Sequence, residues 1–160
     1  MHVKVAGLSQ PQCYRALTVP SGSMSLMDRP VMRDIALVIL RLILGIIFIC
    51  HGWDKIFITG IDKTTGYFVA ANIPQAHLTV WVVALVELVG GALLILGLLA
   101  PTVAMVFIIE MIGAWWSMHL GNGLFIRDNG AELVMSLIGG LVMIFVFGAG
   151  RFSLDRQFIR

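Results

Sequence analysis

Four long apolar stretches, each carrying very few charged residues, divide most of the chain into segments long enough to cross a lipid bilayer. They cover residues 34–52, 78–100, 102–118 and 131–149. A helix that spans the hydrocarbon core needs about 20 predominantly apolar residues, with a range of about 17 to 25. The pattern therefore predicts an all-α fold, an integral membrane four-helix bundle made of two helical hairpins.

The segments between and around these stretches are polar. We expect residues 1–33 to form a flexible polar leader, residues 34–150 to form the membrane domain and residues 151–160 to form a short basic tail. Met24 or Met27 could be the true start, in which case residues 1–23 need not belong to the native protein. Between the first two stretches, residues 66–72 predict a short helix at the membrane interface.

The positions of the cations predict the orientation. Five of them, Arg29, Arg33, Arg151, Arg156 and Arg160, flank the domain at its termini, whereas three, Lys55, Lys63 and Arg127, lie in the opposite loops. Because cytoplasmic loops carry an excess of Lys and Arg, both termini are expected on the cytoplasmic side of a bacterial inner membrane. All four tryptophans then fall at the outer interface, which is where indole rings are enriched.

Composition agrees with this class of protein. The chain is 59% hydrophobic and 12% charged, whereas soluble domains carry about 25% charged residues. The net charge of +2 gives no basic stripe that would suit nucleic acid. Two cysteines cannot form a disulfide framework. The lipid bilayer is the partner that the composition implies.

Ionisable residues inside the apolar stretches are the first candidates for chemistry. Arg41 lies within the first stretch, Glu87 near the middle of the second and Glu110 in the third. Charges in hydrocarbon are costly and tend to pair, so we predict a buried polar cluster of Arg41, Glu87 and Glu110. One arginine cannot neutralise several carboxylates, so at least one glutamate is expected to be protonated part of the time. The alternative is that Arg41 and one glutamate form a fixed structural pair.

A second polar group is predicted at the outer ends of the helices, formed by His51, Lys55, His119 and Glu132. Two histidines and a carboxylate could bind a metal ion. Interfacial histidines that bond to backbone or lipid headgroups are the favoured interpretation, and we predict no metal site.

Small residues share helical faces with these charges. Gly45, Gly90, Gly91, Gly139 and Gly140 are predicted to let the membrane helices approach closely. The charged faces should therefore point into the bundle. The same glycines could instead serve contacts between chains, so a homo-oligomer stays open.

The combined pattern resembles the DoxX family of small bacterial membrane proteins. It consists of Arg41, Gly45, Phe48, His51, Gly52 and Lys55, followed by Glu87, Gly90, Gly91, Leu94 and Gly97, with a similar ending at Gly148–Asp155. The similarity covers residues 33–156. It implies a four-helix membrane bundle and an association with redox and sulfur biochemistry, since relatives act as subunits of a thiosulfate:quinone oxidoreductase or scaffold complexes with superoxide dismutase and a sulfurtransferase.

Three hypotheses for function follow. In the first, the chain is a membrane subunit of a quinone- or sulfur-linked redox complex, whose buried Arg–Glu cluster binds a quinone or handles its protons. If it takes part in catalysis, it does so as an oxidoreductase subunit that depends on a soluble redox or sulfur-metabolism partner. The second is a small proton-coupled transporter or channel, and the third is a non-catalytic membrane anchor for partner proteins. No cofactor other than a quinone is suggested.

Overall fold

The computed structural model describes residues 30–158, and within that range every regular element is a helix. The predictions for residues 1–29 and 159–160 lie outside the described residues. In chain order, the elements are α1 (Pro30–Trp53), η2 (Asp54–Ile58), α2 (Ile61–Ala70), α3 (Ala76–Leu96), α4 (Ala100–Ala114), η3 (Trp115–His119), η4 (Ile126–Asp128), α5 (Glu132–Phe147) and α6 (Asp155–Phe158). The all-α prediction is confirmed.

Three of the described helices are long and apolar enough to cross a membrane. They are the continuous helix Pro30–Ile58, then Ala76–Leu96 and Ala100–His119. The fourth, α5, is apolar but has 16 residues. The chain is therefore an integral membrane protein, while four crossings and the cytoplasmic position of both termini stay predictions. The first helix starts four residues before the predicted boundary and ends beyond it, because η2 continues α1.

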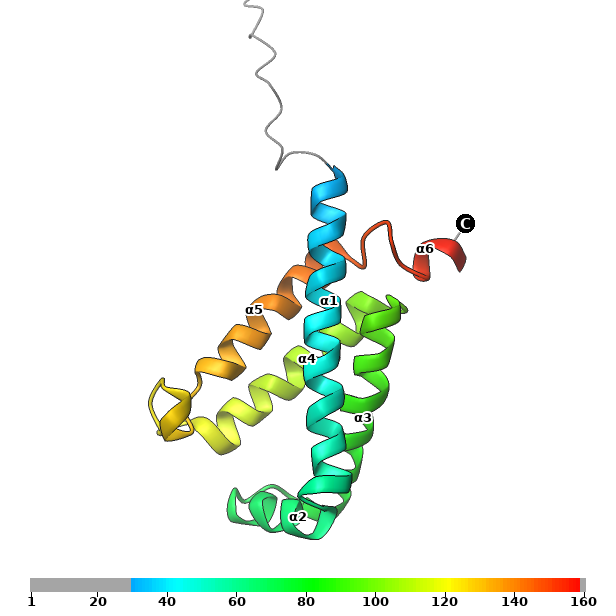
Figure 1. The fold of residues 1–160 in the computed structure, drawn as a ribbon. Coiled ribbons are helices and arrows are strands. Elements are labelled where there is room, and N and C mark those ends of the chain that lie inside the picture. The colour runs from blue at the N-terminus through cyan, green and yellow to red at the C-terminus, as the bar shows by residue number, and fades with distance from the viewer. Residues whose placement is uncertain (1–29, 159–160) are drawn as a thin grey trace, which may run out of the picture.

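The helices form two arms that diverge toward one end (Figure 1). The first arm is the antiparallel pair of α1 and α3, and the second is the pair of α4 and α5, which leans away from the first. The short α2 lies across the far end of α1 and α3, beside the gap between the arms (Figure 1). The start of α1 and the C-terminal segment lie together at the opposite end of the molecule (Figure 1).

Glycines fix the register of α1 against α3. A Cβ placed on Gly45 would lie 2.7 Å from the carbonyl oxygen of Gly91, and a Cβ on Gly91 would lie 2.7 Å from the carbonyl oxygen of Gly45. Only glycine allows backbones to approach this closely, as expected between membrane helices. Further along, the Cβ position of Gly52 is 3.1 Å from the Cβ of Glu87, so the end of α1 lies beside the middle of α3.

Of the other three glycines predicted to pack between helices, two contact a neighbouring helix and one does not. A Cβ placed on Gly90 would lie 2.7 Å from the ring of Phe107. A Cβ placed on Gly140 would lie 3.2 Å from the side chains of Leu40 and Leu44. Gly139 has no neighbour within 4 Å of its Cβ position among the described residues. The prediction that Gly139 packs inside the bundle is therefore wrong, because α5 turns that face outward.

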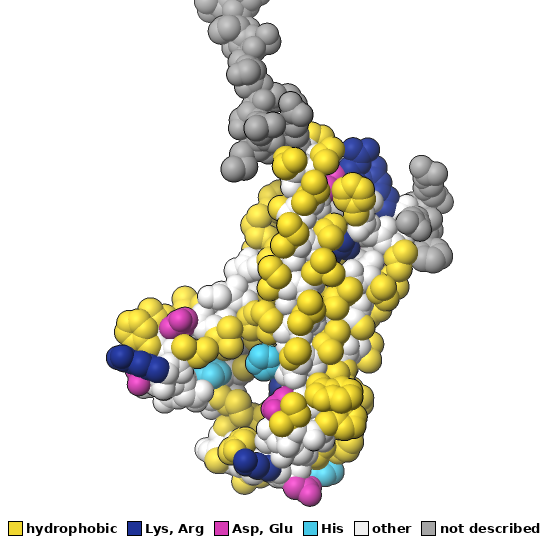
Figure 2. All heavy atoms as spheres, viewed as in Figure 1, with side chains coloured by type: hydrophobic (Ala, Val, Ile, Leu, Met, Phe, Trp, Pro, Cys, Tyr) yellow, Lys and Arg dark blue, Asp and Glu magenta, His cyan; other side chains and the backbone are white. Residues whose placement is uncertain are grey.

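The two arms meet in a core near their junction. The rings of Phe48 and Phe107 stack there, with centroids 3.7 Å apart and an interplanar angle of 5°. Outward-facing positions on all the long helices carry large apolar side chains, which cover much of the surface (Figure 2). Such a surface suits lipid and not water, where large exposed apolar patches are rare.

The C-terminal segment folds back over the end of the first arm and binds Arg41. The Arg41 side chain is only 1% exposed, and its Nη2 donates to the carbonyl oxygen of Phe152 at 2.7 Å. Gly97 leaves room for this guanidinium, since a side chain there would collide with it. The predicted cluster of Arg41 with Glu87 and Glu110 is therefore wrong: the register of α1 and α3 places Arg41 beside Gly97, several turns from Glu87.

Candidate ligand cavity

A cavity of about 620 Å³ lies where the two arms diverge. Its walls come from α1 and η2, α2, α3, α4 and η3, the loop before α5, and α5 itself. In the space-filling view, the molecule is hollowed between the arms and histidine side chains lie at the edge of the hollow (Figure 2). This volume falls in the range of about 300 to 1,000 Å³ that small-molecule sites occupy.

An ion pair lies at the centre of this cavity. The Lys55 Nζ, on η2, donates to Glu87 Oε1 at 2.8 Å and to Glu87 Oε2 at 2.7 Å. The Glu87 side chain is 3% exposed and that of Lys55 is 16% exposed. A carboxylate this deeply buried needs a bonded cation, because the cost of removing it from water is several kcal/mol. Lys55 therefore takes the role predicted for Arg41, as the cation that pairs with Glu87.

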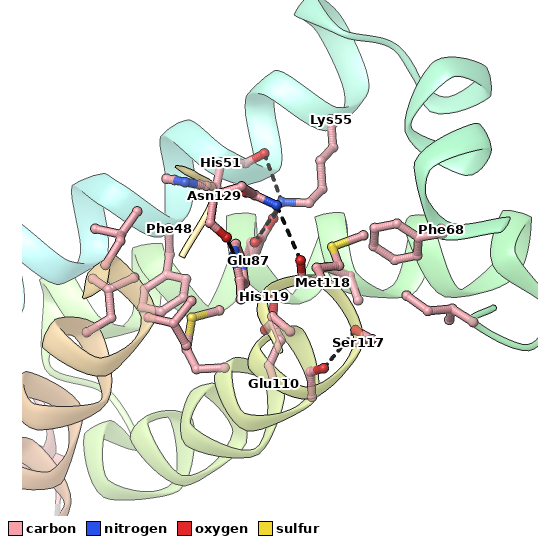
Figure 3. Close-up of a pocket in the computed structure, with 18 of the residues that line it drawn as sticks. Phe48, His51, Lys55, Phe68, Glu87, Glu110, Ser117, Met118, His119 and Asn129 are labelled. Carbon is pink, nitrogen blue, oxygen red and sulfur yellow. Dashed lines mark hydrogen bonds and ion pairs between the residues drawn. The ribbon is translucent and has the colours of Figure 1, made fainter. Parts of the chain in front are cut away.

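A second carboxyl group faces the same cavity from the other arm. Glu110 on α4 lines it, and its Oε2 is buried without a hydrogen-bond partner among the described residues. The close-up shows Glu110 and Glu87 on the cavity wall with Lys55 above them (Figure 3). Two carboxyl groups thus line a cavity that contains one ammonium group, and Oε2 of Glu110 has no hydrogen-bond partner among the described residues.

Two histidines complete the polar set, and each is held by a backbone carbonyl. His51 Nδ1 lies 2.9 Å from the carbonyl oxygen of Ile47, and His119 Nδ1 lies 2.7 Å from the carbonyl oxygen of Asn129. A carbonyl oxygen can only accept, so Nδ1 carries the hydrogen in both rings and Nε2 is the basic nitrogen. Both histidines line the cavity.

π-Helical turns position two of these side chains. Lys55 lies in η2 and His119 in η3, each at the point where a long α-helix reaches the cavity. Single π-turns inside helices are rare and often occur at functional sites. The sequence carries no pattern that distinguishes a π-turn from an α-helical turn, which explains why neither was predicted.

Apolar side chains form the rest of the lining and leave room on both sides of the polar centre. Phe48 lies on one side, and Phe68 and Met118 lie on the other (Figure 3). Met111 and Leu137 also line the cavity. Phe68 comes from α2, whose role as a cavity wall was not predicted, since its sequence indicates only an interfacial helix. The cavity therefore suits a ligand with a small polar group and an apolar body.

The structure brings together five of the predicted site residues: Glu87, Glu110, His51, Lys55 and His119. It separates Arg41 and Glu132 from them. Glu132 Oε2 accepts a hydrogen bond from the backbone N–H of Ile126 at 3.1 Å, which secures the loop before α5. The alternative metal site of His51, His119 and Glu132 is therefore not assembled, and among residues 30–158 no three His, Cys, Asp or Glu side chains gather as ligands.

Comparison with known proteins identifies the class. The sequence model of the DoxX family matches residues 36–120, and this chain belongs to the DoxX family. A Haemophilus influenzae protein described as uncharacterised is 35% identical over 132 residues, which cover 80% of this chain and 94% of that protein. Escherichia coli inner membrane protein YqjF is 29% identical over 133 residues, covering 78% and 93%. No solved structure matches the chain significantly.

One relative carries a name that suggests an activity. A Bacillus subtilis protein named "Putative oxidoreductase CatD" is 36% identical over 81 residues, which cover 51% of this chain and 58% of that protein. The inner-membrane relatives and the long apolar helices place this protein in the inner membrane as a multi-pass protein.

Proposed function

We propose that this protein is the membrane subunit of a redox complex and that its cavity binds the ring of a quinone. The observation that carries the proposal is the cavity itself, a largely apolar space between membrane helices with the pair Lys55–Glu87 and the free carboxyl oxygen of Glu110 at its centre. A relative named as an oxidoreductase supports the redox class.

The residues present fit a quinone. A quinone has a flat ring with two oxygens and an apolar tail, and the cavity offers a polar centre with apolar space on both sides (Figure 3). The aromatic side chains of Phe48 and Phe68 can contact a ring face or tail, as aromatic groups do in most small-molecule sites. A bound quinone would supply chemistry that takes up or releases two electrons and two protons.

The chain's own residues would bind, orient and exchange protons. Lys55 holds both carboxyl oxygens of Glu87 in place. Glu110, His51 and His119 line the same cavity and would hold a proton near a ring oxygen. Proton transfer by positioned side chains of these types is a common catalytic device. Electrons would come from a soluble partner protein, since the sequence has two cysteines and no CxxC pair.

The test is purification from native membranes in mild detergent, followed by mass spectrometry of extractable quinones and of proteins that copurify. The wild-type protein should carry a quinone and a soluble redox or sulfur-metabolism protein. The variant Lys55→Met should lose the quinone, whereas Lys63→Met, which removes an exposed cation from α2 outside the cavity, should retain it.

Two results would contradict the proposal. One is a wild-type protein free of quinone and of redox partners. The other is equal quinone content in wild type and Lys55→Met. A quinone-free protein that alone gives pH-dependent uptake in liposomes would favour proton-coupled transport, with Glu110 as the proton carrier.

A further inference from the structure

The polar side chains around the cavity differ in whether their hydrogen-bonding groups already have partners within the protein. Hydrogen-bond donors among them are bonded within the protein, whereas several acceptors are not. This imbalance limits the chemistry of the ligand, because a polar group that a ligand covers loses its water and then needs a hydrogen-bond partner on the ligand.

All three N–H groups of the Lys55 ammonium have an acceptor within the protein. Its ammonium has three hydrogens, and the structure places three acceptors around Nζ: Glu87 Oε1 at 2.8 Å, Glu87 Oε2 at 2.7 Å and the carbonyl oxygen of His51 at 3.4 Å. The cation therefore holds Glu87 and is not directed at a ligand oxygen.

The uncharged donors are used in the same way. The Ser117 hydroxyl donates to the carbonyl oxygen of Gly113 at 2.8 Å, and the Thr79 hydroxyl donates to that of Pro74 at 3.0 Å. The Asn129 side-chain amide donates to the carbonyl oxygen of Met118 at 3.2 Å, which leaves it one hydrogen. The Nδ1–H groups of both histidines are bonded to carbonyl oxygens, as described above.

The acceptors remain available. No hydrogen bond is made by Nε2 of His51 or of His119 within the described residues, and Oε2 of Glu110 is buried without a partner there. The three side chains come from α1, η3 and α4, so they line the cavity from both arms. A ligand that satisfies them must donate hydrogen bonds.

We infer that the cavity prefers the dihydroxy form of the ring, the quinol, over the quinone. The two forms share one carbon skeleton, but the quinol presents two O–H donors and the quinone presents two carbonyl acceptors. The donors match the Nε2 atoms and the unpaired carboxyl oxygen of Glu110. Among the side chains of residues 30–158 that line the cavity, the carbonyls would find one free N–H, on Asn129. This inference rests on the proposed function and adds to it the redox state that the site recognises.

The test compares three ligands with the same ten-carbon tail: a benzohydroquinone, its benzoquinone and its dimethyl ether, which cannot donate. Each is incubated without oxygen with the purified full-length protein, and bound ligand is measured by mass spectrometry after rapid gel filtration. We expect the hydroquinone to bind about tenfold tighter than either of the others, equivalent to ~1.4 kcal/mol.

Two variants test the assignment of the acceptors. Glu110→Gln replaces an acceptor with a group that also donates, so the preference for hydroquinone should fall to about threefold or less. His119→Phe removes one acceptor at similar size and should have the same direction of effect. Asp62→Asn makes a matched acid-to-amide change on an exposed position of α2 and should leave the preference unchanged.

The outcomes separate this inference from the proposed function. Equal or tighter binding of the benzoquinone or the dimethyl ether would overturn the inference and leave quinone binding standing. A preference that persists undiminished in both Glu110→Gln and His119→Phe would also overturn it. If none of the three ligands binds, the proposed function fails, and the inference fails with it.

Discussion

Replacing Lys55 with methionine should destabilise the protein strongly, because it leaves a buried carboxylate without its cation. Glu87 is 3% exposed, and both of its oxygens lie within 2.8 Å of the Lys55 Nζ. Removing one partner of a buried pair typically costs about 3–5 kcal/mol. We therefore expect Lys55→Met to lower the free energy of unfolding by about 3–5 kcal/mol.

Replacing Glu87, the other member of the ion pair, should lower the free energy of unfolding by less than Lys55→Met does. Glu87→Gln removes the charge but keeps the shape and an amide oxygen, and it leaves an ammonium that is 16% exposed and still bonded to the carbonyl oxygen of His51. A cost of ~1–3 kcal/mol is expected, which is the range for a lost hydrogen bond to a charged group. The double variant Lys55→Met with Glu87→Gln contains no unpaired charge, so it should be more stable than Lys55→Met alone.

The assay is unfolding of the purified proteins in detergent, followed by the loss of helical circular dichroism, for wild type, both single variants and the double variant. A coupling energy of ~2 kcal/mol or more is expected, at the upper part of the range for contacting residues. Lys63→Met controls for loss of an exposed cation and should stay within about 0.5 kcal/mol of wild type. Single-variant costs that add within about 0.5 kcal/mol would refute the assigned ion pair.

Two further changes test how the helices are held. At the start of α4, Asp155 accepts from the backbone N–H of Leu99 at 2.8 Å and from that of Ala100 at 3.3 Å. Asp155→Ala should cost about 1.5–3 kcal/mol, the range for a lost hydrogen bond to a charged group, and an unchanged unfolding midpoint would contradict this. Gly91→Val should lower the free energy of unfolding by ~1–3 kcal/mol or more, because the added side chain overpacks against Gly45. Gly139→Ala places its methyl group in open space, so in the same unfolding assay it should be neutral or stabilising by up to ~1 kcal/mol.

The sequence predicted the helices well because their signal is local. Long apolar runs with few charges define membrane helices whatever their partners are, so the class of protein and the approximate ranges of the long helices could be predicted. The structure extends the first helix to Ile58 through η2. That extension was missed because Trp53, Asp54 and Lys55 indicate an interface and not a continuing helix.

The pairing of charges could not be predicted, because it depends on the register between helices. Counting residues from the predicted ends put Arg41 and Glu87 at similar depths. The contact of Gly45 with Gly91 instead places Glu87 beside Gly52, near the C-terminal end of α1. The partner of Arg41 is the carbonyl oxygen of Phe152, in a tail that local patterns cannot place. Glu110 was predicted as part of a buried polar cluster, and the structure places it in the cavity with Lys55 as the nearby cation.

Photoaffinity labelling would show whether the cavity between the two arms binds a quinone ring. A benzoquinone with a photoreactive tail is irradiated with the protein in bilayer nanodiscs, and labelled residues are mapped by mass spectrometry. We expect labels on cavity residues such as Phe68, Met111 and Met118, and we expect these labels to disappear when excess unlabelled quinone is added. Labels on lipid-facing positions such as Val89 and Ile109, unaffected by the competitor, would contradict it.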